Sequence, residues 1–241
     1  MSDTTATAVD PALGPDLTPA RLAPYIQHTK IDPDATRDAM VAHAREAVTH
    51  GFNAAMVPAS WIPVVAAELS GTGVEVASAL DFPTVGVMTS AGKAAEAAEI
   101  ARLGATQLDI GVQVGWLKSG RYDDFREDIA GVVRAFGGPV KVMLELPLLT
   151  DAEKDAAVDL AMEAGVAFLK NASSGQIETA NPSSVRYLVE RARDGVRVKA
   201  SGAIKTYPQA VELLRAGAAL LGTSAGLAII TDTGDASTVS Y

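Results

Sequence analysis

Short runs rich in β-branched and apolar residues alternate with longer stretches of helical periodicity along almost the whole chain, and this alternation limits the fold more than any other feature. Seven stretches with apolar residues at i, i+3 and i+4 spacing separate eight such runs. Strands and helices that alternate in this way form a parallel sheet joined by helical crossovers. The expected strands are residues 26–30, 52–57, 74–80, 106–112, 140–145, 166–170, 196–200 and 219–223.

Local signals at the ends of the helical stretches support their placement. The expected helices are residues 36–50, 60–70, 90–103, 122–136, 151–164, 182–193 and 207–216. Thr150 followed by Asp151 and Glu153, and Asn181 followed by Pro182, are typical helix starts. Glycine follows five of the stretches within two residues, as a helix C-terminal signal does: Gly51, Gly104, Gly165, Gly195 and Gly217.

The length decides between two arrangements of these units. The chain has 241 residues, close to the ~250 that a single closed barrel of eight β/α units needs. The alternative is an open doubly wound sheet, but no Gly-x-Gly-x-x-Gly follows the first run and no Gly-x-x-x-x-Gly-Lys-Ser/Thr occurs. We therefore predict an α/β fold, a single-domain (β/α)8 TIM barrel over residues 21–232, with a flexible N-terminal arm over residues 1–20 and a C-terminal tail over residues 233–241.

Composition excludes several classes of function. Lys plus Arg number 20 and Asp plus Glu number 29, and the resulting formal charge of −9 repels nucleic acid and anionic lipid. The absence of Cys excludes disulfides, thiolate catalysis and Cys-ligated metal centres, and fits a reducing compartment. No window approaches ~18 continuous apolar residues, and no basic residue precedes Arg21. We expect no membrane span, no secretory signal, no nucleic-acid partner and a cytoplasmic location.

Two lysines lie at the C-terminal ends of neighbouring expected strands, where barrels carry their chemistry: Lys170 and Lys199. A single such lysine is more often a strand-exit residue that extends its ammonium to solvent. Two at the same level repel each other, and burial adds to the effect, so that one amine becomes neutral near pH 7 and attacks a carbonyl. Lys141 begins its expected strand and is expected to point to the structural end of the barrel.

Asp109 stands between Leu108 and Ile110 on the fourth expected strand. Alone, it is either a buried structural acid or a proton-transfer group that faces the barrel mouth. Together with Lys170 and Lys199 it completes a set of a nucleophilic amine, a tuning cation and an acid/base group, which carbinolamine, imine and enamine chemistry requires.

Two turns rich in small residues follow the seventh and eighth expected strands, Gly202-Ala203-Ile204-Lys205 and Gly222-Thr223-Ser224-Ala225-Gly226. They are either ordinary tight turns or a phosphate cradle, because barrels often bind phosphate at these two positions with backbone amides and a short helix N-terminus.

Metal chemistry and a Ser-His-Asp triad have no support in the sequence. The three histidines are His28, His43 and His50; His43 and His50 are expected on the surface of one helix, and His28 stands alone. No cluster of His and carboxylates can be assembled, and no nucleophile elbow is present. We predict no metal and no cofactor.

The motifs resemble those of the deoxyribose-phosphate aldolase family over roughly residues 22–232. They are His28-Thr29, Leu108-Asp109, the stretch 115–120 (Gly-Trp-Leu-Lys-Ser-Gly), the stretch 149–154 (Leu-Thr-Asp-Ala-Glu-Lys), Phe168-Leu169-Lys170, the stretch 198–202 (Val-Lys-Ala-Ser-Gly) and Gly222-Thr223-Ser224.

The resemblance implies a class I aldolase on a (β/α)8 barrel that joins acetaldehyde to glyceraldehyde 3-phosphate reversibly. It implies that Lys170 forms the Schiff base, that Lys199 favours the neutral amine of Lys170, and that Asp109 is the acid/base partner acting through water. It also implies a homodimer and, in some members, a tail whose terminal Tyr reaches the site, here Tyr241. The predicted substrate and phosphate contacts are Thr29, Ser173, Gly202, Ala203, Lys205, Gly222 and Ser224.

Four segments depart from the family pattern on the substrate side. Where the family usually has Lys-Thr-Ser-Thr-Gly, this chain has Lys170-Asn171-Ala172-Ser173-Ser174, and where many members have Ser-Gly-Gly-Ile-Arg, it has Ser201-Gly202-Ala203-Ile204-Lys205. Gln27 stands where an acidic residue commonly precedes His-Thr. The usual Asn-Pro or Tyr-Pro of the second strand is replaced by Val57-Pro58-Ala59. A methyl at Ala203 obstructs close approach of a phosphate to the backbone. Lys205 offers a single ammonium group where Arg would offer a planar guanidinium that donates two parallel hydrogen bonds to a phosphate. Two alternatives therefore stay open: a related carbonyl lyase with an unphosphorylated or bulkier acceptor, and a catalytically silent sugar-binding barrel.

Overall fold

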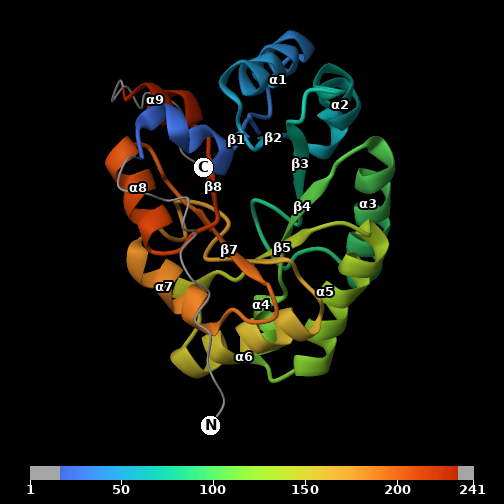
Figure 1. Cartoon of the computed structure of the whole chain (residues 1–241). Helices are drawn as coiled ribbons and strands as arrows, with labels where there is room; N and C mark the ends of the chain where they lie inside the picture. The colour runs from blue at the N-terminus through green and yellow to red at the C-terminus, as the bar shows by residue number, and fades with distance from the viewer. Residues whose placement is uncertain (1–16, 233–241) are drawn as a thin grey trace.

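The computed structural model describes residues 17–232 and shows eight parallel strands that close into one barrel, surrounded by helices (Figure 1). The strands are β1 (Ile26–Thr29), β2 (Ala54–Met56), β3 (Glu75–Leu80), β4 (Gln107–Gly111), β5 (Val140–Met143), β6 (Phe168–Lys170), β7 (Arg197–Ser201) and β8 (Leu220–Thr223). Each strand pairs with its successor, and β8 pairs with β1, with Leu221 beside Ile26. The predicted (β/α)8 barrel is confirmed, and the open doubly wound sheet is excluded.

Seven longer helices follow the predicted stretches, and α3 and α5 match their predicted ranges at both ends. They are α1 (Arg37–His50), α2 (Ile62–Leu69), α3 (Ser90–Leu103), α5 (Tyr122–Phe136), α6 (Asp151–Glu163), α7 (Pro182–Arg191) and α8 (Tyr207–Arg215). Shorter elements lie within the connections: α4 (Val114–Lys118), α9 (Gly226–Thr231) and the 3-10 helices η1 (Pro19–Tyr25), η2 (Ala59–Trp61) and η3 (Leu146–Leu148).

The helix N-terminal signals predicted from the sequence form N-cap hydrogen bonds in the structure. Thr150 and Glu153 form a reciprocal capping box at the start of α6. The Asn181 side chain accepts a hydrogen bond from the backbone N–H of Ser184 at the start of α7, with Pro182 in the first turn. These local interactions satisfy backbone donors that would otherwise lack partners, and so they place the helices independently of the barrel.

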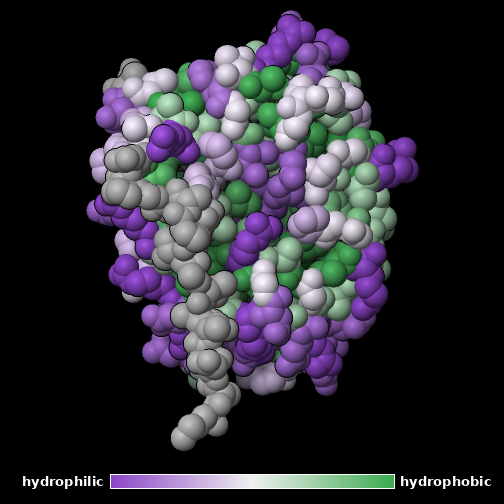
Figure 2. Space-filling view, viewed as in Figure 1, coloured by the Kyte–Doolittle hydropathy of each residue, from purple (hydrophilic) through white to green (hydrophobic). Residues whose placement is uncertain are grey.

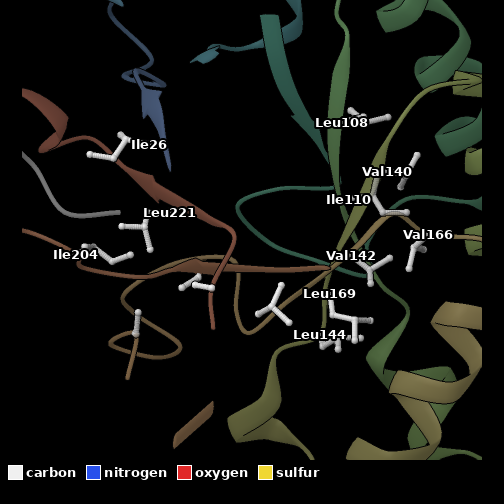
Figure 3. Close-up of a cluster of buried hydrophobic side chains, with 14 of the residues drawn as sticks. Ile26, Leu108, Ile110, Val140, Val142, Leu144, Val166, Leu169, Ile204 and Leu221 are labelled. Atoms are coloured by element: carbon white, nitrogen blue, oxygen red, sulfur yellow. The ribbon is translucent and has the colours of Figure 1, made fainter. Parts of the chain in front are cut away.

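The outer face of the barrel wall is apolar. Figure 3 shows part of the buried cluster, including Leu108 and Ile110 from β4 and Val140 and Val142 from β5. Successive strand residues point to opposite faces, and burial of each such side chain between strands and helices contributes roughly 1.5–3 kcal/mol. This alternation turns the residues between them, Asp109 among them, toward the barrel interior.

The chain packs against the barrel from Leu17 onward. Leu17 is buried, the Tyr207 hydroxyl donates a hydrogen bond to its carbonyl oxygen, and η1 contacts α9. The N-terminal arm predicted for residues 1–20 therefore overlaps the packed structure at residues 17–20. Residues 1–16 and the predicted tail at 233–241, with Tyr241, lie outside the described residues.

Hydrophilic residues gather over the outer helices in the view of Figure 2, and the middle of that face carries hydrophobic and hydrophilic residues side by side. Ion pairs on the helix surfaces include Arg102 with Glu99 and Arg193 with Asp159. In the stretch from residue 17 to 232, no helix is long and apolar enough to cross a membrane.

His43 is buried, so its predicted surface position is wrong. Its ring stacks on His28 with the ring centroids 4.4 Å apart, and its Nε2 lies 3.1 Å from the His28 carbonyl oxygen. His28 in turn lies 2.6 Å from the Glu46 carboxylate. Burial, followed by the neighbouring His28, lowers the pKa of His43 to about 3. The histidines thus pack the α1 layer onto β1.

We expect acid to destabilise the protein through His43. Between about pH 6.5 and pH 3 the unfolded chain protonates this histidine and the folded chain does not, so the free energy of unfolding falls with falling pH. The loss from this residue between pH 7 and pH 4 is about 3 kcal/mol. Urea unfolding at several pH values measures it, with His43→Gln as the control that does not titrate; equal pH dependence of both proteins would contradict the assignment.

Candidate active site

A cavity at the C-terminal ends of the strands contains all ten predicted site residues. Its lining includes the proposed catalytic residues and the proposed substrate contacts: Asp109, Lys170, Lys199, Thr29, Ser173, Gly202, Ala203, Lys205, Gly222 and Ser224. The apolar side chains of Ile31, Met56 and Phe82 complete one side. Residues separated by almost 200 positions in the chain therefore lie in one place, while their roles stay predictions.

Asp109 is the centre of the cavity floor. It is fully buried on β4, and its Oδ2 accepts hydrogen bonds from Lys199 Nζ at 2.6 Å and from Lys170 Nζ at 3.0 Å. Lys170 and Lys199 lie side by side in the register of β6 and β7. The expected grouping of two amines and one carboxylate is present.

Lys141 belongs to the same cluster, so the expectation that it points to the structural end is wrong. It is fully buried, and its Nζ lies 3.4 Å from Asp109 Oδ1, on the other side of the carboxylate from the two lysines. Its strand position lies directly beside Asp109 in the pairing of β4 and β5. The signal was available in the sequence: Val140 and Val142 face outward, so the residue between them faces inward.

The cluster contains one carboxylate and three amines, and the ionisation of its members shifts accordingly. Burial raises the pKa of Asp109, but Lys199, Lys170 and Lys141 together outweigh burial, and the pKa lies well below its usual range. Burial lowers the pKa of Lys199 well below its usual range, and Lys170 and Lys141 lower it further against the attraction of Asp109. Burial likewise lowers the pKa of Lys141. The site therefore holds a carboxylate anion beside amines that lose protons readily.

Lys170 is the more accessible of the two amines at the cavity. Its side chain is 7% exposed, against 1% for Lys199 and none for Lys141. Both amines line the cavity and bind the same Asp109 oxygen, and Lys170 exposes more of its side chain there.

Sequence reasoning missed Glu145, which supports Ser173 from behind the cavity. Glu145 is fully buried in a left-handed backbone conformation (φ 53°), and its Oε1 accepts a hydrogen bond from the Ser173 backbone N–H at 2.9 Å. Burial raises the pKa of this carboxyl. Its position after β5 was the only sequence signal.

Asn171, one of the departures from the family pattern, connects the ends of β6 and β7. Its Nδ2 donates to the Ser201 carbonyl oxygen at 3.0 Å, and its Oδ1 accepts from the Ser201 backbone N–H at 2.9 Å. The Nδ2 also donates to Glu178. Asn171 therefore replaces a hydroxyl with a two-sided amide bridge that fixes Ser201 at the cavity.

Two predicted glycines are required by close packing. A Cβ at Gly222 would overlap Ser201 Oγ and lie 2.9 Å from Lys199 Cε, so glycine there leaves room for the lysine. Gly202 adopts φ +120°, and a Cβ there would overlap the Glu178 carbonyl oxygen. Both roles are steric, whether or not a phosphate also binds these turns.

Ala203 and Lys205 form the part of the cavity where the predicted phosphate contacts lie. Ala203 adopts φ +49°, an uncommon conformation for a residue with a Cβ, and its methyl lies against the backbone position of Gly175. Lys205 is half-buried at the cavity, and within residues 17–232 no acidic side chain pairs with its ammonium. An anion in the cavity can therefore bind this charge without competition from a carboxylate.

Within the part of the chain that the structure describes, no group of three His, Asp or Glu side chains is arranged to hold a metal ion.

No family model matches the chain, but individual proteins do. Deoxyribose-phosphate aldolase of Thermosynechococcus vestitus is 44% identical over 206 residues, which cover 86% of this chain and 94% of the relative. The enzyme of the same name from Rhodospirillum rubrum is 41% identical over 225 residues, 93% of this chain and 94% of the relative.

Solved structures agree with the sequence relatives. The tetrameric deoxyribose phosphate aldolase of Aeropyrum pernix superposes with a TM-score of 0.81 at 29% identity, over 90% of this chain and 93% of that one. An aldolase called QR15 superposes with the same TM-score of 0.81 at 28% identity, over 88% and 95%. With relatives above 40% identity along most of both chains and the same closed barrel, this chain belongs to the deoxyribose-phosphate aldolase family.

Proposed function

We propose that the protein is a class I aldolase that joins acetaldehyde to glyceraldehyde 3-phosphate, reversibly, through a Schiff base on Lys170. One observation carries the proposal: Lys170 is the accessible amine of the cavity, and it shares one oxygen of a fully buried carboxylate with a second amine. Family membership supplies the substrates that the relatives' name implies.

The geometry supports a division of labour between the three side chains. Lys170 Nζ attacks the carbonyl carbon of the donor aldehyde, and the carbinolamine loses water to give an imine. Removal of a proton from the donor's methyl carbon then gives an enamine, which attacks the acceptor aldehyde. Lys199 is suited to accept and return protons because its pKa lies well below the usual range. Asp109 stays ionised and holds both amines in place.

A carbonyl lyase with an unphosphorylated or bulkier acceptor is the second candidate. Ala203 replaces a glycine of the family pattern in the cavity lining, and Ile31 and Phe82 give the cavity apolar walls. The Lys205 ammonium, which no acidic side chain of residues 17–232 pairs with, supports a phosphorylated acceptor instead, and we favour that acceptor for this reason.

Two further proposals rest on family membership. We propose a homodimer in solution, whereas the Aeropyrum pernix relative is a tetramer. We propose a cytoplasmic location, which the absence of Cys in the whole sequence supports.

Borohydride reduction in the presence of acetaldehyde is expected to leave a stable ethyl adduct on Lys170. Peptide mass spectrometry locates the modified residue, and Lys170→Met, which keeps the length of the buried chain, is expected to lose both the adduct and at least a thousandfold in turnover. A folded wild-type protein with an unmodified Lys170, or an adduct on Lys199, would overturn the assignment. A silent sugar-binding barrel would bind the sugar without forming any adduct.

Replacement of Lys205 is expected to weaken only the phosphorylated substrate. Lys205→Met should raise KM for cleavage of 2-deoxyribose 5-phosphate about tenfold, equivalent to about 1.4 kcal/mol, and leave kinetics with 2-deoxyribose unchanged. Lys118→Met is the matched control, because Lys118 is an exposed lysine of α4 that pairs with Glu153 outside the cavity. Wild-type protein that cleaves both sugars equally well would favour the unphosphorylated acceptor.

The pH dependence of activity is expected to respond to Lys141. Because Lys141 lowers the pKa of Lys199 by repulsion, Lys141→Met should raise that pKa. The acidic limb of the kcat/KM profile reports deprotonation of the amine cluster, so it should move to higher pH by about one unit. Measurement between pH 5 and pH 9 tests the sign, and a shift to lower pH would contradict the role of Lys141.

A further inference from the structure

Three polar side chains form a chain across the barrel interior beneath Lys199, and the reaction proposed above uses none of them. Gln27 of β1 and Gln107 of β4 are buried, and Glu75, the first residue of β3, is half-buried. The barrel interior of this family member is therefore polar well below its catalytic floor, although barrel interiors are usually filled by branched apolar side chains.

The hydrogen bonds of the chain run in one direction. Lys199 Nζ donates to Gln27 Oε1 at 2.5 Å, and Gln27 Nε2 donates to Gln107 Oε1 at 2.6 Å. Gln107 Nε2 then donates to the Glu75 carboxylate. Asn53 Oδ1 accepts from both amide nitrogens, at 3.2 Å from Gln27 and 3.4 Å from Gln107.

The direction follows from the chemistry of Glu75. A carboxylate only accepts hydrogen bonds, so Gln107 must present its Nε2 to Glu75 and its Oε1 to Gln27. Gln27 must then present its own Nε2 to Gln107, which leaves its Oε1 facing Lys199. Asn53 reinforces this orientation, because its acceptor oxygen faces the two amide nitrogens.

Small side chains make room for this arrangement. Ala54 of β2 lies beside Gln27 on one side and beside Glu75 on the other, and Ala77 lies beside Gln107 in the strand register. Both alanines are fully buried. Larger residues at these positions would displace the two glutamine side chains.

The orientation of Gln27 matters for the protonation of Lys199. A carbonyl oxygen stabilises an ammonium strongly and a neutral amine weakly, whereas an amide N–H group would repel the ammonium. The charged and titratable groups that face Lys199 are Asp109 from β4, Lys141 from β5 and Lys170 from β6. Gln27 is therefore the neutral contact that opposes burial and the repulsion of two lysines.

We propose that Glu75, Gln107 and Gln27 form a directional hydrogen-bond relay that holds a carbonyl oxygen against Lys199, so that Lys199 retains a proton that it can give up and take back in the reaction proposed above. The proposal rests on the function proposed above for Lys170 and Lys199. Glu75 and Gln107 are positioning residues in this scheme, because their hydrogen bonds reach Lys199 through Gln27. The charge of Glu75 also raises the pKa of Lys141 against its burial, and the Gln27→Met background separates this direct effect from the relay.

A reversal of the relay from its remote end tests the proposal. In Glu75→Lys the end group becomes a donor, so Gln107 and Gln27 should both turn over and present the Gln27 N–H group to Lys199. In Glu75→Gln the charge is lost but an acceptor oxygen remains for Gln107, so the relay should keep its direction. The two variants separate hydrogen-bond direction from plain charge.

The readout is the titration of Lys199 in protein labelled with 13C-lysine, followed by NMR and assigned with Lys199→Met. Glu75→Lys should lower the titration midpoint by about one pH unit, and Glu75→Gln should leave it within roughly 0.3 units of wild type. In the Gln27→Met background, where the relay is cut, the Glu75→Lys shift should fall to roughly a third. If Glu75→Lys does not fold, Gln107→Met cuts the relay at its centre and should also lower the midpoint.

Two results would overturn the relay. One is a Glu75→Lys shift of the Lys199 titration midpoint that is equal with and without Gln27. The other is a Glu75→Gln shift about half as large as the Glu75→Lys shift, because either result indicates that the charge at position 75 acts on Lys199 directly through space. The titration requires no turnover. Failure of wild-type protein to form the acetaldehyde adduct would therefore reject the proposed function, whereas an adduct with an unmoved Lys199 titration would reject only the relay.

Discussion

The buried carboxylate of Asp109 is the interaction on which the rest of the site depends. Transfer of an ammonium into a barrel interior costs several kcal/mol unless an opposite charge lies beside it. Asp109 contacts Lys170, Lys199 and Lys141 within 3.4 Å. One carboxylate cannot neutralise three ammonium groups, and burial together with repulsion from the neighbouring amines lowers the pKa of Lys199 and of Lys141.

The barrel wall makes this arrangement possible by separating two environments. The outward face of each strand is apolar and packs against the helices, as Leu108 and Val142 do (Figure 3). The inward face carries ionisable side chains in place of the usual branched apolar filling. Hydrophobic stabilisation therefore comes from the layer between strands and helices. The interior adds a few apolar side chains, such as those of Met56, Met143 and Phe168, and it also holds the charged cluster.

Some departures from the family pattern are residues that hold the backbone or the amines in place, and others line the cavity. Asn171 bridges the backbone of Ser201, and Gln27 contacts Lys199 directly. Gln27 stands where the family commonly has an acidic residue, so one negative charge is missing beside the amines. Asp109 therefore compensates more of the positive charge of Lys170, Lys199 and Lys141. Ala203 tolerates its left-handed backbone beside Gly175, so the added methyl is accommodated within the turn itself. The amine cluster and the turns after β7 and β8 thus lie in separate parts of one cavity.

The sequence by itself determined the barrel, its helix boundaries and the identity of the central residues, because strand and helix periodicities and capping are local properties of the chain. Asp109, Lys170 and Lys199 could be chosen since each stands at the C-terminal part of an expected strand. Only the tertiary structure decided that Lys141 and Glu145 join them and that His43 is buried. Alternation along β5 indicated that Lys141 faces inward. Which groups Lys141, Glu145 and His43 meet depends on which strands and helices lie together in the closed barrel, and contacts between residues so far apart in the chain leave no periodic signal in the sequence.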